Sequence, residues 1–510
     1  MPLLNQWLEA AARDSGSQRA LVYRDAYLSW RGLAHRVERR ANELRSLGIG
    51  PGDGVGLMLG NVPDMVVLTL ALDRLEAIAV PLDPATSARD LDMILDAAPL
   101  KALITRPATN TTTPVGVPSP SRRPTPLALR VTDAAKAATP KYRSESKRRL
   151  SGSLLNISMY RREPMTFELP RPRMMAFTVD AGGDPKGVLR QDEQLDAIAR
   201  SLGEALDAQN GQSALLPTPF HYSSAFDAGL VFALGNRLTM ELEDEFQARS
   251  LARLLRDDCA DYVLGTPAQY GALAQAMTSR QPAPRARCLC IQSPGLLAAA
   301  NAFEEKWQSA LLPLWHSAET GPVALDDSVQ PYRGAGAGLS TCAGKLLPGV
   351  ALKVTAPDGS PLPSGVTGQL WLRSGAVSAA AVPQLPRVIR AVGPVGVPIG
   401  RADPDGWFRT GDLGFLDATD NRVFLTGRED DLVWVEGRRL ALGEVEGCLE
   451  SFSKIRAAEA RVIYDERAGP MVVARVVPSG PCRVEDIIDH CARNLAPYKV
   501  PRKIELCSAL

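Results

Sequence analysis

The chain has 510 residues, of which 45% are hydrophobic and 23% are charged, a composition typical of a globular protein with two to four domains. Its 58 Lys and Arg residues nearly balance its 57 Asp and Glu residues, so the net charge is +1. This balance gives no electrostatic reason to expect nucleic acid or an anionic membrane as the main partner. We expect no membrane span and no secretory signal, because no apolar run is long enough and the N-terminus lacks a basic start followed by an apolar stretch.

The eight cysteines are dispersed along the chain and form no C-x-x-C pair. Free thiols in a reducing cytoplasm are therefore expected, rather than disulfides. With only four histidines in the chain, a His/Cys zinc site is not expected.

The first hundred residues alternate between helical and strand patterns. Hydrophobic periodicity and stop signals predict helices at 30–50, 62–78 and 87–98, and strands at 52–61, 79–84 and 101–105. Alternation at this spacing is typical of an α/β fold with a largely parallel sheet.

Residues 106–172 interrupt this alternation. They are rich in Pro, Thr, Ser and Arg and include the basic run KYRSESKRRL, so we expect an irregular insertion, either a solvated loop or a basic interaction segment. Regular alternation resumes from Met174 to about Gly321. Gly/Pro-punctuated short strands at 342–375 indicate a β-rich subdomain, and 376–402 reads as a loop.

A smaller unit follows. Residues 428–510 show a strand-turn start, a helix near LGEVEGCLES, strands at EARVIYD and MVVARVVP, and a helix at VEDIIDHCARNL. This order predicts a compact α+β domain after a large domain at 1–427.

The stretch FTVDAGGDPKGV (177–188) has two adjacent glycines followed by Pro-Lys-Gly, which is how a phosphate-binding loop can end. It lacks the G-x-x-x-x-G-K-[ST] spacing of a Walker loop. Asp180 places a negative charge where phosphate would lie, at a cost of a few kcal/mol for charges about 4 Å apart.

Three further segments stand in a fixed order with this loop: WHSAETGP (315–322), DGWFRTGDLGFLD (405–417) and FLTGREDDLVWVEGRRLALGEVE (424–446). Together they resemble the acyl-adenylate-forming (AMP-binding) superfamily, which includes acyl-CoA synthetases, aryl-CoA ligases, luciferases and peptide-synthetase adenylation domains. The resemblance covers nearly the whole chain. It implies a large N-terminal domain of α/β subdomains plus a β-rich subdomain, and a small mobile α+β C-terminal domain.

The resemblance assigns nucleotide-binding roles to four residues. Asp412 would accept both ribose hydroxyls of ATP, and Arg428 would add a donor to the same ribose. Glu319 matches the Mg²⁺-ligating glutamate, since Mg²⁺ prefers oxygen ligands. Trp315 matches an aromatic residue that stacks on adenine. The alternatives are a turn-capping Asp412, a solvated Glu319 and a core-packed Trp315.

In the phosphate loop of the family, backbone N–H groups, hydroxyls and a lysine hold the β- and γ-phosphates. Thr178, Gly183, Lys186 and Gly187 match this pattern, and Pro185 is retained as well. Residues 179–182 replace the other hydroxyls and an early glycine, so the loop keeps its frame with fewer donors.

The acyl and thiol sides carry four further assignments. His221, in LPTPFHYSSAFDAG, would gate or orient the acyl group beside Tyr222, with a core-packed histidine as the alternative. Asp430 matches the hinge on which the small domain rotates between two half-reactions. Gly437 matches the loop lining the thiol channel, where the neighbouring Arg438 and Arg439 either meet a phosphate or remain solvated. Glu319, His221 and Lys186 are the candidate catalytic residues.

The sequence also departs from the family pattern. Ala318 stands where a threonine usually precedes the glutamate, SPGLL (293–297) matches a Gly-rich segment only loosely, and Trp434 replaces a common lysine. The family continues past VPRKIEL to a Gly-Lys segment whose lysine contacts the α-phosphate, and the sequence stops before that point.

These observations favour an ATP- and Mg²⁺-dependent enzyme that activates a carboxylic acid and transfers the acyl group to CoA or to phosphopantetheine on an acyl carrier protein. One alternative is a non-adenylating member that binds an acyl group, a nucleotide or a partner. Another is an enzyme that performs only the thioester half of the cycle. Both aliphatic and aryl acids remain open.

Overall fold

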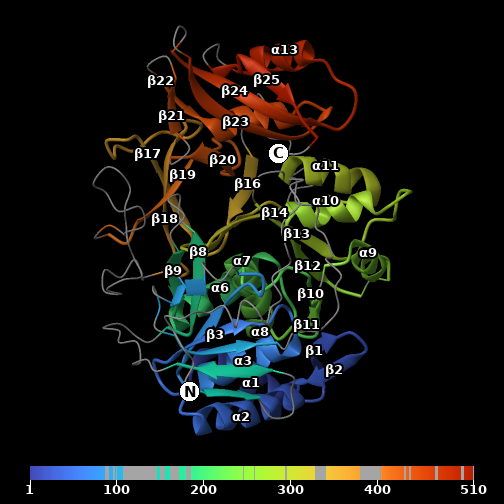
Figure 1. Cartoon of the computed structure of the whole chain (residues 1–510), viewed down its shortest axis with the longest axis vertical. Coiled ribbons are helices and arrows are strands. Elements are labelled where there is room, and N and C mark those ends of the chain that lie inside the picture. Colours follow the sequence, from blue (N-terminus) through green and yellow to red (C-terminus); the bar gives the residue numbers. More distant parts are fainter. Residues whose placement is uncertain are drawn as a thin grey trace.

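The computed structural model describes residues 1–86, 91–92, 94–95, 98, 100–106, 146–149, 155–160, 172–179, 185–244, 246–257, 259–292, 296–327, 341–378, 403, 405–429, 432–435, 438–465, 469–495 and 499–508. Figure 1 shows an elongated molecule with the N-terminal helices at one end and the C-terminal unit at the other. The predicted α/β class is confirmed, because two large mixed sheets carry helices between their strands.

The first large sheet has seven strands in the order β6-β7-β5-β3-β4-β8-β9. Its strands are β3 (Gly54–Met58), β4 (Ile78–Pro81), β5 (Leu100–Thr105), β6 (Ser146–Arg149), β7 (Asn156–Met159), β8 (Met174–Val179) and β9 (Pro185–Arg190). The neighbouring pairs among β5, β3, β4 and β8 are parallel. Strands β6 and β7 lie inside 106–172, so the expectation of an irregular segment there missed two strands. Antiparallel pairing of β7 with the edge of β5 supplies the ladder that their own sequence does not predict.

The second large sheet has thirteen strands in the order β17-β18-β19-β20-β16-β15-β14-β13-β12-β10-β11-β1-β2. These are β1 (Arg19–Tyr23), β2 (Ala26–Ser29), β10 (Ser213–Leu216), β11 (Thr239–Leu242), β12 (Tyr262–Gly265), β13 (Arg287–Ile291), β14 (Leu312–Ser317), β15 (Gly321–Leu325), β16 (Thr341–Leu346), β17 (Ala351–Thr355), β18 (Gly368–Arg373), β19 (Phe408–Leu416) and β20 (Val423–Arg428). At one edge of this sheet, β1 and β2 pair antiparallel. The neighbouring pairs between β1 and β14 are parallel, and those between β14 and β17, at the other edge, are antiparallel. The change of direction at β14 separates the α/β part from the predicted β-rich part.

The helices of the large domain are α1 (Leu3–Asp14), α2 (Trp30–Ser46), α3 (Pro63–Arg74), α6 (Asp192–Ala205), α7 (Ser223–Ala225), the π-helix η1 (Phe226–Val231), α8 (Phe232–Gly235), α9 (Ala248–Arg256), α10 (Pro267–Gln275) and α11 (Leu296–Trp307). Local sequence explains several of their ends. The Ser29 hydroxyl accepts from the Gly32 N–H at 3.2 Å and caps α2. Gly48, with φ of 84°, lies two residues beyond the end of α2, so the helix ends before the predicted bound at residue 50.

The C-terminal unit contains the hairpin β21 (Leu432–Val435) and β22 (Arg438–Ala441), the sheet β23 (Ile455–Asp465), β24 (Gly469–Pro478) and β25 (Lys503–Leu506), and the helices α12 (Leu442–Glu450) and α13 (Val484–Asn494). The two helices and the three-stranded sheet enclose their own apolar core, which includes Val445, Val476 and Ile487. The order matches the prediction through α13, and β25 adds a strand that the sequence analysis did not predict.

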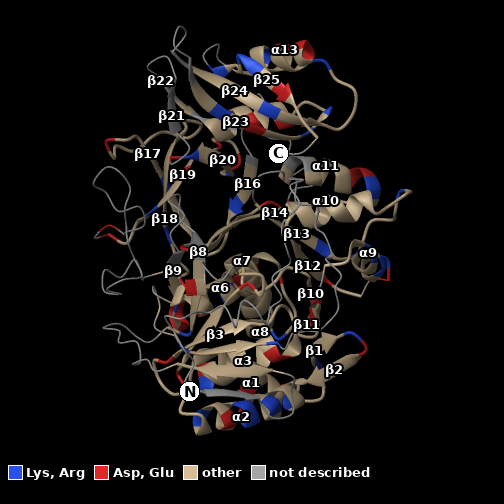
Figure 2. Cartoon of the chain, in the orientation of Figure 1, with Lys and Arg blue, Asp and Glu red and all other residues tan. Residues whose placement is uncertain are grey.

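In Figure 2, acidic and basic residues are interspersed along the ribbon at both ends of the molecule. All eight cysteines are free thiols, which confirms the expectation against disulfides. Among the described residues, no helix is both long and apolar enough to cross a membrane.

Candidate active site

The centre of the site is a cross-strand ion pair between β19 and β20. Asp412 and Arg428 are register partners in this antiparallel pair. Arg428 Nη1 lies 2.8 Å from Asp412 Oδ1, and the Asp412 N–H donates to the Thr410 hydroxyl at 2.9 Å. The Asp412 side chain is 11% exposed and that of Arg428 is 45% exposed, so the pair is open on the arginine side. The two residues assigned to the ribose are therefore in direct contact.

Two further candidate residues, Trp315 and Glu319, affect the pKa of the Asp412 carboxyl group. Burial raises the pKa of Asp412 to about 6, while the Arg428 charge and a hydrogen bond from the Trp315 indole lower it, and the nearby Glu319 charge raises it. The carboxylate is thus ionised at neutral pH, although it is buried. Trp315, on β14, is itself buried among core residues of the β-rich part. This position fits the alternative that Trp315 is a core-packed residue. It also fits a residue whose indole N–H donates to the Asp412 carboxylate.

Glu319 lies in the turn between β14 and β15. The Ser317 and Thr320 hydroxyls are 2.8 Å apart, and the Thr320 N–H donates to Ser317 Oγ at 3.2 Å, which closes the turn. Gly321 follows with φ of 68°. The Glu319 carbonyl accepts from the Ser378 N–H at 2.7 Å, and its side chain is half-buried. This defined turn places Glu319 close enough to Asp412 for its charge to raise the pKa of that carboxyl group.

The described ends of the stretch 177–188 lie on β8 and β9, which pair as the antiparallel strands of a β-hairpin. Thr178 is the register partner of Lys186, and Phe177 is that of Gly187. The hairpin thus brings together the predicted residues on its two strands. Gly183 and Asp180, at the connection, lie outside the described residues.

The acyl-side candidates stand just before α7. His221 Nε2 is 3.8 Å from Asp83 Oδ2, and the His221 and Tyr222 ring centroids are 4.5 Å apart. Burial lowers the pKa of His221 and the Asp83 carboxylate opposes this effect, so the imidazole is neutral at pH 7. Tyr222 is half-exposed beside it. His221 is consequently a largely buried side chain rather than a free surface one, with an exposed fraction of 14%.

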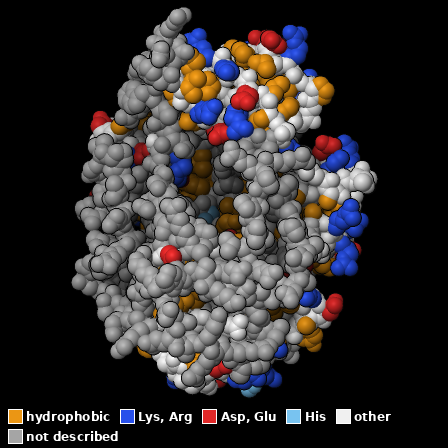
Figure 3. Space-filling view, viewed as in Figure 1, with side chains coloured by type: hydrophobic (Ala, Val, Ile, Leu, Met, Phe, Trp, Pro, Cys, Tyr) orange, Lys and Arg blue, Asp and Glu red, His pale blue; other side chains and the backbone are white. Residues whose placement is uncertain are grey.

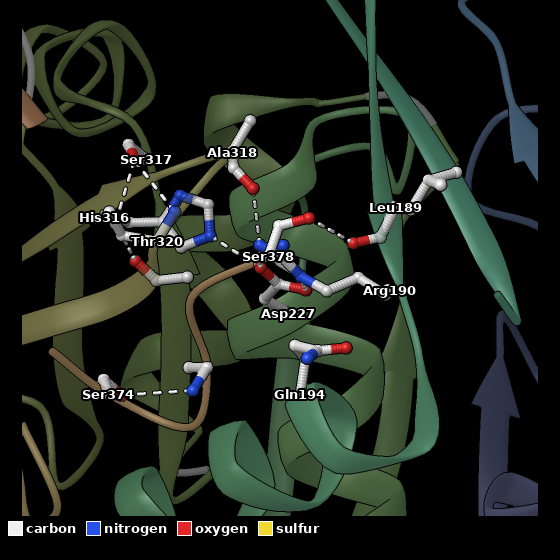
Figure 4. Close-up of polar contacts among 12 residues, drawn as sticks. Leu189, Arg190, Gln194, Asp227, His316, Ser317, Ala318, Thr320, Ser374 and Ser378 are labelled. Carbon is white, nitrogen blue, oxygen red and sulfur yellow. Dashed lines mark hydrogen bonds and ion pairs between the residues drawn. The ribbon is translucent and has the colours of Figure 1, made fainter. Parts of the chain in front are cut away.

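Sequence reasoning missed a buried cluster of Arg190, Asp227 and His316, shown in Figure 4. Arg190 Nη2 is 2.7 Å from Asp227 Oδ2, and His316 Nε2 is 2.9 Å from the same oxygen. Burial would raise the pKa of Asp227, but the charge of Arg190 and the hydrogen bond from His316 hold it below its usual value. A signal was available, since Arg190 directly follows the apolar pair Val188 and Leu189 on β9 and a histidine follows Trp315 directly.

Two other residues with predicted roles, Asp430 and Gly437, lie outside the residues that the structure describes. Among those that are described, no group of three or more His, Cys, Asp or Glu side chains could hold a metal ion. Figure 3 shows that one face of the molecule is hollowed below the C-terminal unit, with hydrophobic side chains visible inside the hollow.

Residues 8–380 match the family model for the AMP-binding enzyme, and residues 444–510 match that for the AMP-binding enzyme C-terminal domain. The chain therefore belongs to the AMP-binding enzyme family, and the predicted resemblance to the acyl-adenylate-forming superfamily is confirmed. Its relatives include CoA ligases and other adenylate-forming enzymes.

Three comparisons illustrate the likeness. The chain is 23% identical to 2-succinylbenzoate–CoA ligase of Bacillus licheniformis, over 99% of this chain and 96% of that protein. It is 25% identical to medium-chain fatty-acid–CoA ligase of Escherichia coli, over 99% of this chain and 88% of that one. The structure of o-succinylbenzoate CoA synthetase from Bacillus subtilis, in complex with its acyl-adenylate intermediate, superposes with a TM-score of 0.75 at 20% identity, covering 100% of this chain and 95% of that one. The shared fold confirms the predicted architecture with a C-terminal domain.

Proposed function

We propose that this protein activates a carboxylic acid as an acyl-adenylate at the expense of ATP and then transfers the acyl group to a thiol. The observation that carries the proposal is the buried, ionised Asp412 carboxylate, held by Arg428 and Trp315 within electrostatic reach of Glu319. One carboxylate that accepts two ribose hydroxyls and a second that ligates Mg²⁺ are what adenylation requires of these positions.

In the first half-reaction, a carboxylate oxygen of the acid attacks the α-phosphorus of ATP and pyrophosphate leaves. Lys186, Thr178 and the backbone at Gly183 and Gly187 would hold the phosphates, and Trp315 would border the adenine. Bound Mg²⁺, ligated by Glu319, would neutralise charge on the phosphates. The contribution of the protein is mainly positioning and charge stabilisation.

In the second half-reaction, the sulfur of CoA or of a phosphopantetheine arm attacks the acyl carbonyl carbon, and AMP leaves. His221, a neutral imidazole next to Tyr222, would border the acyl group. We assign Asp430 to the hinge and Gly437 to the thiol channel, with residues 428–510 as the unit that rotates. An acyl carrier protein is the alternative thiol donor, and the cytoplasm is the expected compartment.

A non-adenylating relative is the second candidate, because two specific features favour it. Ala318 has no hydroxyl to offer the α-phosphate, and Asp180 adds a negative charge to the phosphate loop. Such a protein would bind an acyl ligand, a nucleotide or a partner without releasing pyrophosphate. An enzyme limited to the thioester half would consume a supplied acyl-adenylate.

The test is pyrophosphate release from Mg-ATP with a panel of aliphatic and aryl acids, followed by mass spectrometry of thioesters after addition of CoA. Acid-dependent pyrophosphate release that Glu319→Gln lowers by at least about tenfold supports the proposal. Asp405→Asn, at an exposed position in the same domain, is the matched control and should leave the rate unchanged. Absence of pyrophosphate with every acid would favour the non-adenylating candidate, and thioester formed only from supplied acyl-adenylate would favour the third.

A further inference from the structure

The Arg190–Asp227–His316 cluster joins three elements that are far apart in the sequence. Arg190 is the last residue of β9, four positions after Lys186, Asp227 lies in the π-helix η1, and His316 follows Trp315 on β14. In Figure 4, Arg190 and His316 approach the Asp227 carboxylate from opposite sides. The π-helical turn is rare in proteins and is found frequently at functional sites.

The cluster is almost fully buried, with side-chain exposures of 1% for Arg190, 0% for Asp227 and 2% for His316. A buried ion pair is costly to desolvate, and replacing one with apolar residues is often neutral or stabilising. Within the described part of the chain, Arg190 Nη1 also has no hydrogen-bond partner. Stability alone therefore does not account for this arrangement.

Arg190 makes one more contact, which leads directly to the candidate site. Its Nη2 donates to the Ala318 carbonyl at 2.6 Å as well as to Asp227. Ala318 immediately precedes Glu319, so the guanidinium holds the backbone at the carboxylate assigned to Mg²⁺.

A second link runs parallel to the first. The Ser378 hydroxyl donates to the Leu189 carbonyl at 2.9 Å, and the Ser378 N–H donates to the Glu319 carbonyl at 2.7 Å. Two consecutive carbonyls, those of Ala318 and Glu319, are thereby tied to two consecutive residues of β9. The strand that carries Lys186 and the turn that carries Glu319 are fixed to each other at two points.

We propose that Arg190 is a positioning residue for adenylation: anchored by Asp227, its guanidinium holds the Ala318 carbonyl and so sets the Glu319 carboxylate relative to the phosphate hairpin. The inference rests on the proposed function, since it concerns how the same site is assembled. Small displacements of groups that meet a transition state are expensive, with about a hundredfold loss of rate for a 1 Å error. The effect of losing this anchor should therefore appear in kcat more than in binding.

Arg190→Lys is the discriminating variant. Lysine keeps a positive charge for Asp227 but lacks the planar fork that reaches Asp227 and Ala318 together. Arg200→Lys is the matched control, because Arg200 lies on α6, the next helix, is 76% exposed and pairs with Asp196 one turn earlier on the same helix. We expect Arg190→Lys to lower kcat for pyrophosphate release by between about tenfold and a hundredfold, with the KM for the acid unchanged within about threefold. Arg200→Lys should leave both parameters unchanged.

A double variant separates positioning from stability. Arg190→Met with Asp227→Asn removes both charges and leaves an acceptor oxygen for His316. We expect its melting temperature to equal or exceed that of Arg190→Lys, because no uncompensated charge is buried, while its kcat stays as low. A kcat within twofold of wild type for either variant would overturn the inference.

Hydrogen exchange provides a readout that does not depend on activity. Backbone amides at 317–321 should exchange faster in Arg190→Lys than in wild type or Arg200→Lys. If the wild-type protein releases no pyrophosphate, the proposed function fails. If exchange at 317–321 is unchanged in Arg190→Lys, the anchor itself fails, whatever the activity of the wild type.

Discussion

Replacing Asp412 with asparagine should stabilise the protein and remove nucleotide binding at the same time. Burial raises the pKa of Asp412 from 3.8 to about 6, so the folded state disfavours the ionised carboxylate. Each pKa unit corresponds to about 1.4 kcal/mol, so the ionised side chain lowers the free energy of unfolding by about 3 kcal/mol at pH 8. Asparagine keeps an oxygen that can accept from Trp315 and Arg428 while it removes the charge.

Because folding raises the pKa of Asp412, the stabilisation by Asp412→Asn depends on pH. Between the unfolded-state pKa near 4 and the folded-state pKa near 6, the folded protein binds more protons, so wild-type stability falls as pH rises through this window. The gain from Asp412→Asn should therefore be about 3 kcal/mol at pH 8 and about half of that at pH 5.

Scanning calorimetry at the two pH values measures this difference, and a rise of a few degrees in melting temperature is expected at pH 8. Asp417→Asn is a control of opposite sign, because hydrogen bonds from Thr419 lower the pKa of the exposed Asp417. It should give no stabilisation. A melting temperature for Asp412→Asn that is unchanged or lower at pH 8, or a gain that is as large at pH 5 as at pH 8, would refute the reasoning.

Three further predictions concern the same region. Arg428→Met removes the charge that favours the ionised Asp412, so Mg-ATP affinity measured by calorimetry at pH 7 should fall about tenfold, with little loss of stability because Arg428 is 45% exposed. Trp315→Phe keeps the aromatic volume but loses the indole donor to Asp412, so the same measurement should show a loss of a few-fold, and an unchanged affinity would remove Trp315 from the nucleotide site. Gly344→Ala should lower stability by on the order of 3 kcal/mol or more in thermal unfolding, because its Cβ would lie 2.2 Å from neighbouring backbone atoms, whereas Gly349→Ala, with a similar φ and open space, should cost only about 1 kcal/mol.

The linear motifs of the sequence identified candidate residues that the structure places on adjacent strands. TGDLG and GRED place Asp412 and Arg428 16 positions apart, and a short antiparallel connection brings such residues into register. The start of α2 at Trp30 was predicted correctly, and a local signal, the Ser29 cap, controls it. The predicted helix 62–78 ended earlier, at Arg74, because Glu76 adopts a left-handed φ of 54° that no local signal indicates.

Contacts between distant segments could not be predicted in the same way. Arg190 is 37 positions from Asp227 and 128 from Ala318, and tertiary packing brings these residues of β9, η1 and the β14–β15 turn together. Strand β6, with the sequence SKRR, has little intrinsic β-propensity and forms through pairing with β7. Both the Arg190 cluster and strand β6 therefore depend on contacts with other segments of the chain rather than on their own local sequence.

Calorimetric titration of the wild-type protein with Mg-ATP tests the central claim most directly, because it requires no knowledge of the acid. A dissociation constant in the millimolar range or below is expected for wild type, together with no detectable binding to Asp412→Asn, whose folded state the calorimetric scans establish independently. No heat of binding to the wild-type protein at several times that concentration would contradict the account. The Asp412 and Glu319 carboxylates would then be remnants of a nucleotide site rather than parts of a working one.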